Sequence, residues 1–227
     1  MFILFRVQSI FPYDKIVLMK NMGEESAKTL AAYEAHALEY VKQYPYHEAD
    51  FSESWIEKSL RGVAKDAEIL EIGSGVGVTA KFIESLGYKI QVSDAAKSFV
   101  KYLRENGFPN ARQFNLITDE FWQNFDYILA DAVLLHFTKD EVREVLKKVY
   151  DALNPGGIFE FSFMLGEGER WQNRLGAERY FKDWQINEVQ EILDDVDFDA
   201  KIEISGNYND KNSERRWICV TVQKGQK

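Results

Sequence analysis

The sequence predicts an α/β fold with a doubly wound sheet of seven strands, mostly parallel with one antiparallel strand, and helices on both faces. Strand-like apolar runs alternate with amphipathic helix-like segments through the middle of the chain, which is typical of a parallel sheet with right-handed crossovers. The last two strand-like runs follow each other with no helix between them, which indicates a closing antiparallel pair. The chain of 227 residues suits a single domain.

Seven segments are expected to be strands: AEILEI (67–72), YKIQVS (88–93), ARQFNL (111–116), FDYILA (125–130), IFEFSF (158–163), AKIEIS (200–205) and RWICVTVQ (216–223). Helices are expected at 24–43, 54–63, 77–86, 95–106, 138–153 and around 189–196. The helix at 138–153 is the clearest, because Thr138 and Glu141 form a capping box before a regular apolar stripe. Residues 164–184 are expected to form a long loop.

Composition and charge exclude several classes of protein. The net charge of −9 repels phosphate backbones, so a nucleic-acid partner is disfavoured. No run of apolar residues is long enough for a membrane helix, so no membrane partner is expected. The single cysteine, Cys219, cannot form a disulfide within the chain, which fits a reducing, cytoplasmic setting. The N-terminal run MFILF is either an extra strand or part of an overextended reading frame whose true start is Met22.

The stretch LEIGSGVGVTAKF (70–82) carries the strongest signal. Gly73, Gly75 and Gly77 follow a buried strand and open a helix, so the backbone can approach a ligand closely and offer free N–H groups. A dinucleotide fingerprint, G-x-G-x-x-G, would need glycine at position 78, which is Val78. The pattern from Glu71 to Gly77 is instead E-x-G-x-G-x-G, and NAD is not expected to bind.

With this motif the sequence resembles the class I S-adenosylmethionine-dependent methyltransferases over residues 25–224. The resemblance implies a Rossmann-like fold, S-adenosyl-L-methionine as cofactor and S-adenosyl-L-homocysteine as product. Asp94 ends the second strand, 21 residues after Gly73, where a carboxylate accepts the ribose hydroxyls; a solvated turn aspartate is the alternative. Relatives often carry an acidic residue after the third strand, where this chain has Asn115 and Leu116. The implied cofactor-binding residues are Glu71, Gly73, Ser74, Gly75, Gly77, Asp94, Ala95, Asn115, Ala130 and Tyr33.

His136 is the candidate catalytic base, because it follows the fourth strand and histidine titrates near neutral pH. The alternative is a histidine that bonds to the backbone and shapes the pocket. His36 and His47 show no metal-ligand spacing, so no metal site is expected. Tyr33 and Tyr40 share a helix face and either line the site or pack in the core.

The segment 164–184 resembles that of a tellurite-resistance-like, small-molecule subgroup of these methyltransferases. Its arginines, Arg170, Arg174 and Arg179, stand among aromatic residues and suggest an anionic acceptor, such as a carboxylate. The alternative is that Arg179 pairs with an internal acid and only folds the loop. The candidate acceptor-binding residues are Arg170, Arg179, Tyr180 and Trp184.

The favoured function is methyl transfer to a small acceptor by in-line displacement. Methylation of tRNA or protein, and a cofactor-binding relative without catalysis, are the alternatives. Residues 1–60 are expected to hold an N-terminal extension and cofactor-covering helices, and residues 61–227 the methyltransferase core, within one domain overall. The chain is expected to be a monomer or a homodimer. The sequence does not identify the acceptor or its nucleophilic atom.

Overall fold

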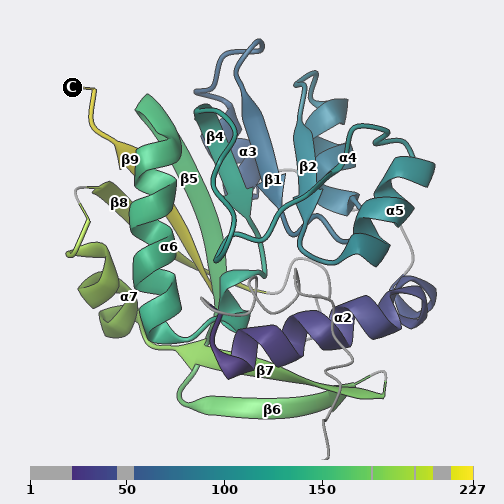
Figure 1. Cartoon of the computed structure of the whole chain (residues 1–227). Helices are drawn as coiled ribbons and strands as arrows, with labels where there is room; N and C mark the ends of the chain where they lie inside the picture. Colours follow the sequence, from purple (N-terminus) through teal and green to yellow (C-terminus); the bar gives the residue numbers. More distant parts are fainter. Residues whose placement is uncertain (1–21, 45–53, 175, 197, 207–215, 227) are drawn as a thin grey trace, which may run out of the picture.

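The computed structural model describes residues 22–44, 54–174, 176–196, 198–206 and 216–226 (Figure 1). The expectation of an extra N-terminal strand falls on residues outside these ranges. None of the helices in the described ranges is long and apolar enough to cross a membrane.

A mostly parallel sheet forms the centre of the molecule. Its parallel strands lie in the order β3-β2-β1-β4-β5, and β9 continues the sheet antiparallel to β5, with β8 antiparallel to β9. The bounds are β1 Ile69–Ile72, β2 Gln91–Asp94, β3 Arg112–Gln113, β4 Phe125–Ala130, β5 Leu153–Leu165, β8 Phe198–Gly206 and β9 Arg216–Lys224. These seven strands confirm the predicted mostly parallel α/β fold, and β9 runs antiparallel to its neighbours β5 and β8. Two further strands join the sheet and were not predicted.

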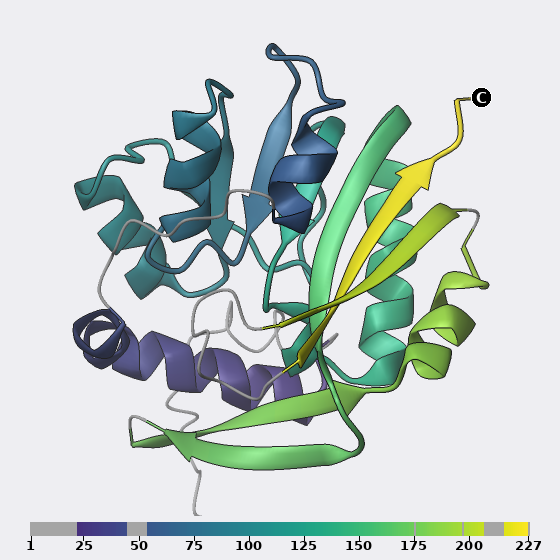
Figure 2. The same cartoon turned by 180° about the vertical axis from the view of Figure 1, so that it is seen from behind.

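The prediction of a long loop at 164–184 was wrong. This segment forms an antiparallel hairpin of β6 (Glu169–Arg174) and β7 (Ala177–Trp184). The end of β7 pairs with the end of β5, so the hairpin is an extension of the main sheet. Figure 2 shows it passing beneath the lower ends of the central strands.

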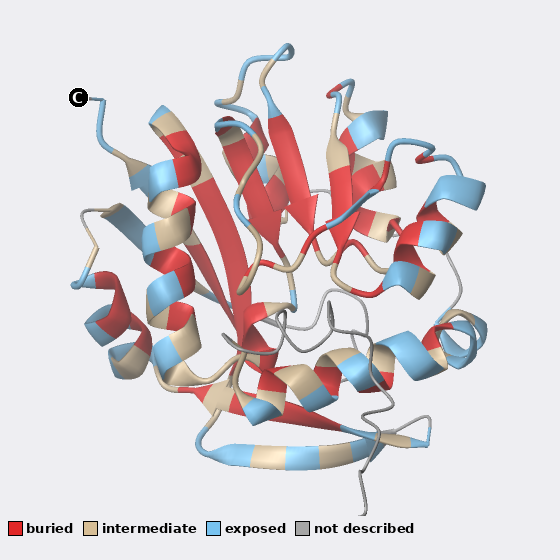
Figure 3. Cartoon of the chain, viewed as in Figure 1, coloured by how far each residue is buried: buried red, intermediate tan, exposed pale blue. Residues whose placement is uncertain are grey.

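Helices cover both faces of the sheet. They are α2 (Glu24–Gln43), α3 (Trp55–Leu60), α4 (Val78–Ser85), α5 (Lys97–Glu105), α6 (Lys139–Ala152) and α7 (Ile186–Leu193), with a short 3-10 turn, η2 (Leu134–His136). The apolar stripes of α6 and α7 pack on one face, and α3 and α4 pack on the other. The buried residues therefore concentrate on the strands and on the inward faces of these helices (Figure 3).

Helix α2 lies across the carboxyl ends of the parallel strands, between the sheet and the hairpin (Figure 1). At its N-terminus Glu141 of α6 accepts hydrogen bonds from the Gly23 N–H at 2.9 Å and from the Ser26 hydroxyl at 2.6 Å. Farther along α2, the Thr29 hydroxyl accepts the Tyr180 N–H of β7 at 2.9 Å. The helix is kinked at His36, whose φ and ψ are −121° and 21°. This helix forms the cover of the pocket described next.

Candidate active site

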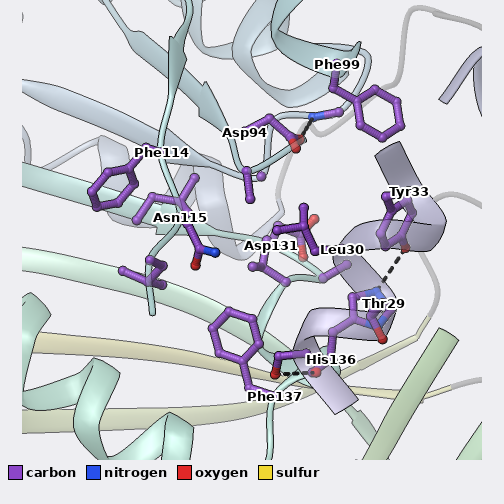
Figure 4. Close-up of a pocket in the computed structure, with 18 of the residues that line it drawn as sticks. Thr29, Leu30, Tyr33, Asp94, Phe99, Phe114, Asn115, Asp131, His136 and Phe137 are labelled. Atoms are coloured by element: carbon purple, nitrogen blue, oxygen red, sulfur yellow. Dashed lines mark hydrogen bonds between the residues drawn. The ribbon is translucent and has the colours of Figure 1, made fainter. Parts of the chain in front are cut away.

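A pocket lies where the carboxyl ends of β1, β2 and β4 meet α2 (Figure 4). Ligands in open parallel sheets bind at this edge, so its position follows from the fold. The polar side chains on its wall are Ser26, Thr29, Tyr33, Tyr40, Asp94, Asn115, Asp131 and His136, and apolar residues such as Leu30, Phe99 and Phe114 fill the spaces between them.

The glycine loop after β1 forms one side of the pocket. Gly75 lines it with a φ of +53°, and a Cβ added there would meet nothing within 4 Å. Gly77 caps α4 with a φ of +81°, and a Cβ there would lie 2.8 Å from the Phe108 ring. Gly75 thus leaves open space for a ligand, whereas Gly77 allows α4 to pack closely.

Asp94 at the end of β2 faces this loop. Its Oδ2 accepts the Gly75 N–H at 3.1 Å, and its Oδ1 accepts the Ala96 N–H at 2.9 Å. The side chain is almost buried, with 9% exposed, and burial raises the pKa of the carboxyl to about 6, although the two N–H groups oppose this. Each oxygen keeps capacity to accept one more hydrogen bond from a ligand.

A second acidic residue, Asp131, follows β4 directly. The Ser162 hydroxyl of β5 donates to Asp131 Oδ1 at 2.6 Å and accepts the Ala132 N–H at 2.8 Å. Ala132 has a φ of +56°, which is uncommon for a residue with a side chain. Strained backbone of this kind concentrates at functional sites. Together with Asp94, Asp131 gives the pocket two carboxyl groups, which follow the strands on either side of β1.

Beneath the loop, Glu71 is buried in β1. Its Oε2 has no hydrogen-bond partner among the described residues, and burial raises the pKa of the carboxyl to about 7. A buried polar atom without a partner is costly and is found most often near a site of function.

His136 belongs to a chain of hydrogen bonds that links the pocket to β7. Its Nδ1 lies 2.7 Å from the backbone oxygen of Tyr180; because a carbonyl only accepts, Nδ1 carries the proton. Its Nε2 therefore accepts from the Tyr33 hydroxyl at 2.9 Å, and Arg179 Nη1 donates to the same hydroxyl at 2.9 Å. Burial and the charge of Arg179 together lower the pKa of His136 to about 4, although the hydrogen bond to the Tyr180 carbonyl opposes this. The ring is neutral at pH 7, and both of its nitrogens are engaged.

Comparison with known proteins bears on this geometry. A family model described as a methyltransferase domain matches residues 70–159, from β1 to β5. Over this segment, which is less than half of its length, the chain is similar to a methyltransferase domain. The matched segment supplies the glycine loop and four of the eight polar side chains on the pocket wall, Asp94, Asn115, Asp131 and His136.

The curated relatives of this chain are distant. A carboxy-S-adenosyl-L-methionine synthase of Campylobacter fetus is 27% identical over 152 residues, which are 60% of this chain and 64% of the relative. A synthase of the same name from Desulfotalea psychrophila is 23% identical over 155 residues, or 60% of this chain and 63% of the relative. The chain therefore matches less than two thirds of the length of these relatives.

Solved structures share the whole fold. A DhpI–S-adenosylhomocysteine complex aligns with a TM-score of 0.68 at 19% identity, covering 89% of this chain and 98% of that chain. The 1,6-didemethyltoxoflavin-N1-methyltransferase of Burkholderia thailandensis aligns with a TM-score of 0.66 at 14% identity, covering 97% and 93%. At such identities the likeness shows the fold alone. It is the fold of the S-adenosylmethionine-dependent methyltransferases, and the tellurite-resistance-like subgroup stays a prediction.

The structure brings together six of the residues predicted to bind the cofactor. Those that line the pocket are Tyr33, Gly73, Gly75, Asp94, Ala95 and Asn115, whereas Glu71, Ser74, Gly77 and Ala130 lie outside its wall. Asn115 Oδ1 accepts the Ile117 N–H at 3.0 Å, so the amide oxygen is already engaged. Tyr33 and Tyr40 line the pocket and also pack on each other, with ring centroids 5.8 Å apart, so the two alternatives hold together.

The residues predicted to bind the acceptor are placed less favourably. Arg170 forms an ion pair with Asp183 of the neighbouring strand, a structural role of the kind that was considered for Arg179. Trp184 is fully buried and stacks on Phe163 with centroids 4.4 Å apart, in the main core. Tyr180 is buried, and its backbone forms hydrogen bonds with the side chains of Thr29 in α2 and His136 in η2. None of the four predicted residues lines the pocket, but Arg179 reaches it through Tyr33.

Sequence reasoning missed Asp131 and the apolar wall. Asp131 is the first residue after β4, so the rule that ligands bind beyond the carboxyl ends of strands could have found it. Leu30 and Thr29 lie on the same helix as Tyr33, but nothing in the sequence showed how that helix crosses the sheet. Within the described ranges, no cluster of three or more His, Cys, Asp or Glu residues could hold a metal ion.

Proposed function

We propose that the chain is an S-adenosylmethionine-dependent methyltransferase that acts on a small acceptor. The observation that carries this proposal is the pairing of Asp94 with Gly75 inside an acidic pocket at the carboxyl edge of the sheet. Asp94 keeps acceptor capacity for the two hydroxyls of a ribose. The open space beside Gly75 can hold the amino-acid part of the cofactor, which is attached to the ribose. The carboxylates of Asp94 and Asp131 suit a ligand with positively charged groups.

The rest of the pocket also fits this cofactor. Phe99, Phe114 and Leu116 provide apolar surface for a purine ring, and Asn115 stands beside them. The unpartnered Oε2 of Glu71 lies in the strand that leads into the glycine loop. When bound, S-adenosylmethionine supplies a methyl group on a positively charged sulfur, which an acceptor displaces in line.

The residues of this chain contribute mainly by placing the reactants. Alignment of two reactants can account for about 7–11 kcal/mol of a barrier. Helix α2 covers the pocket with Leu30 and Tyr33 and keeps water away from the reacting atoms. Glu141 fixes the start of this cover through Gly23 and Ser26.

For His136, the geometry supports an orienting role more than a base role. A pKa of about 4 makes Nε2 a weak proton acceptor at pH 7, and Tyr33 already donates to it. His136 then holds the Tyr33 hydroxyl in one direction, so that the hydroxyl oxygen can accept from Arg179. An acceptor atom that is already unprotonated at neutral pH requires no base.

A second candidate comes from the names of the curated relatives, which are synthases of carboxy-S-adenosyl-L-methionine. In that case the nucleoside would be the product rather than the methyl donor. Methylation of tRNA has less support, because the net charge is −9. The acidity would suit a basic protein as acceptor, but helix α2 covers the described pocket.

One experiment separates these candidates. Purified protein is incubated with S-adenosylmethionine that carries a deuterated methyl group and with pools of small metabolites, and both products are measured by mass spectrometry. We expect S-adenosylhomocysteine and an acceptor with the label in equal amounts, and neither with Asp94→Asn. A carboxylated nucleoside would support the second candidate. Binding of the cofactor without turnover in any pool would favour the relative without catalysis.

A further inference from the structure

Arg179 is a buried cation beside the pocket. Its side chain is 6% exposed, yet within the described part of the chain it forms no ion pair. The other two cations of the same hairpin that are described both have acidic partners: Arg170 pairs with Asp183, and Lys182 pairs with Glu188 at 3.1 Å. A buried cation normally has a partner, so the partner of Arg179 is expected to be a ligand.

The contacts of Arg179 leave one edge of the guanidinium without a hydrogen-bond partner among the described residues. Nη1 donates to the Tyr33 hydroxyl, and the plane lies over the Tyr33 ring at 4.8 Å and near the Phe181 ring at 5.7 Å. Nε is buried with no hydrogen-bond partner among the described residues, and none is seen for Nη2 there. Nε–H and Nη2–H are adjacent, parallel donors, and their spacing matches the two oxygens of a carboxylate.

The position of this edge connects it to the proposed reaction. Tyr33, which holds the guanidinium, lines the pocket, and so does His136 beyond it. We propose that Arg179 binds a carboxylate of the methyl acceptor, side-on through Nε and Nη2. This inference rests on the proposed function. Tyr33 and His136 are then positioning residues that fix the direction of the guanidinium.

The surroundings favour a small acceptor over a polymer. Asp94 and Asp131 make the rest of the pocket acidic, so only an anion placed directly on Arg179 is held. Nε is buried, so a carboxylate can reach it only if the side chains that cover it move aside. We therefore expect binding to shift side chains between α2 and β7.

The test uses acetate as the carboxylate probe and acetamide as its neutral analogue, at equal ionic strength. Melting temperatures are measured with and without saturating S-adenosylhomocysteine for the wild type, Arg179→Gln and Arg143→Gln. Arg143 of α6 pairs with Glu191 of α7 and with Asp140 and Asp195, and it is not part of the pocket wall. Its variant is therefore a control for the loss of an arginine elsewhere in the protein. We expect acetate to stabilise the wild type and the control by ligand binding, acetamide to have no effect, and Arg179→Gln to lose the acetate response.

A second variant and a second anion test the geometry of the guanidinium fork. Arg179→Lys keeps the charge but lacks the fork, and should bind acetate at least tenfold more weakly, which decides the matter if Arg179→Gln does not fold. Methylphosphonate in place of acetate tests a tetrahedral anion, and a stronger response to it would overturn the carboxylate assignment. An equal response of wild type and Arg179→Gln to acetate, or none in the wild type, would overturn the proposal.

The cofactor has a carboxylate of its own, so its affinity must be measured as well. We expect Arg179→Gln to bind S-adenosylhomocysteine and 5′-methylthioadenosine, which lacks the amino-acid part, as tightly as the wild type does. Loss of affinity for S-adenosylhomocysteine alone would mean that Arg179 holds the cofactor, contrary to the proposal. Failure of the wild type to bind either nucleoside would defeat the proposed function, while the acetate arm without nucleoside would still decide the role of Arg179.

Discussion

Asp94 Oδ2 and the backbone nitrogen of Gly75 lie 3.1 Å apart, so the carboxylate that ends β2 fixes the loop that follows β1. The same carboxylate faces the pocket. One side chain therefore shapes the loop and presents acceptors to a ligand. This double role makes Asp94 the most informative residue to change.

Asp94→Asn should weaken the binding of S-adenosylhomocysteine at least tenfold. The variant loses charge-assisted hydrogen bonds that are worth about 1.5–3 kcal/mol each. Calorimetric titration measures the change, with Asp66→Asn on the exposed surface as control. Because the pKa of Asp94 is about 6, the affinity of the wild type should fall between pH 7 and pH 5, and the variant should not show this dependence. Unchanged affinity in the folded variant would remove Asp94 from the binding site.

Two glycine variants should behave in opposite ways. Gly75→Ala places a Cβ in open pocket space at a cost of about 1–2 kcal/mol for the positive φ, so stability should fall little and nucleoside affinity should fall greatly. Gly77→Ala adds a contact of 2.8 Å with Phe108, so its main effect should be on stability. Urea unfolding and titration of both variants check this. Equal losses of affinity would mean that Gly75 does not face the ligand.

Glu141→Gln should loosen the start of α2. Its carboxylate accepts from Gly23, Ser26 and Thr138, and loss of the charge should cost about 1–3 kcal/mol. Hydrogen exchange should become faster in the first turns of α2. Glu144→Gln, on the same helix but paired only with Lys147 at the surface, should leave that exchange as it is. Similar hydrogen exchange in both variants would refute the role of Glu141 in holding the start of α2.

The buried His136 should make stability fall with acid. Its pKa is about 4 in the folded protein and about 6.5 in the unfolded chain, so the unfolded chain takes up the proton first. The free energy of unfolding should decline by up to about 3 kcal/mol from this group as pH falls from about 6.5 to 4. Glu71, whose folded pKa is raised to about 7, acts in the opposite sense, because its contribution is lost as pH rises through 7.

The contribution of His136 is therefore measured as a difference. Urea unfolding of the wild type and of His136→Asn is followed at several pH values, and the wild type should lose stability relative to the variant toward pH 4. Asparagine is chosen because its amide can still donate to the Tyr180 carbonyl. Parallel profiles would show that His136 is not held neutral by burial.

The sequence was sufficient for the elements whose pattern is local. β4 was predicted with its observed bounds, because every residue from Phe125 to Ala130 except Asp126 is buried and apolar. The bounds of α2 were also correct, from Glu24 to Gln43. The motif of glycines followed by Asp94 located the edge of the sheet where the pocket lies.

The hairpin was missed for a physical reason. Residues 179–182 of β7 are all buried, so the alternation typical of a half-buried strand is absent. Two of the four are charged, Arg179 and Lys182, and buried charges look like surface positions in a sequence. The roles of Trp184 and Arg170 depend on contacts with Phe163 and Asp183, which no local pattern reveals.

The central claim is that this pocket binds S-adenosylmethionine. The most direct measurement is calorimetric titration of the purified chain with S-adenosylmethionine, S-adenosylhomocysteine and NADH under the same conditions. The account predicts one site for each of the first two ligands, lost or weakened at least tenfold in Asp94→Asn, and negligible binding of NADH, because Val78 replaces the glycine that a dinucleotide loop requires. Binding of NADH, or no binding of either S-adenosyl ligand, would contradict it.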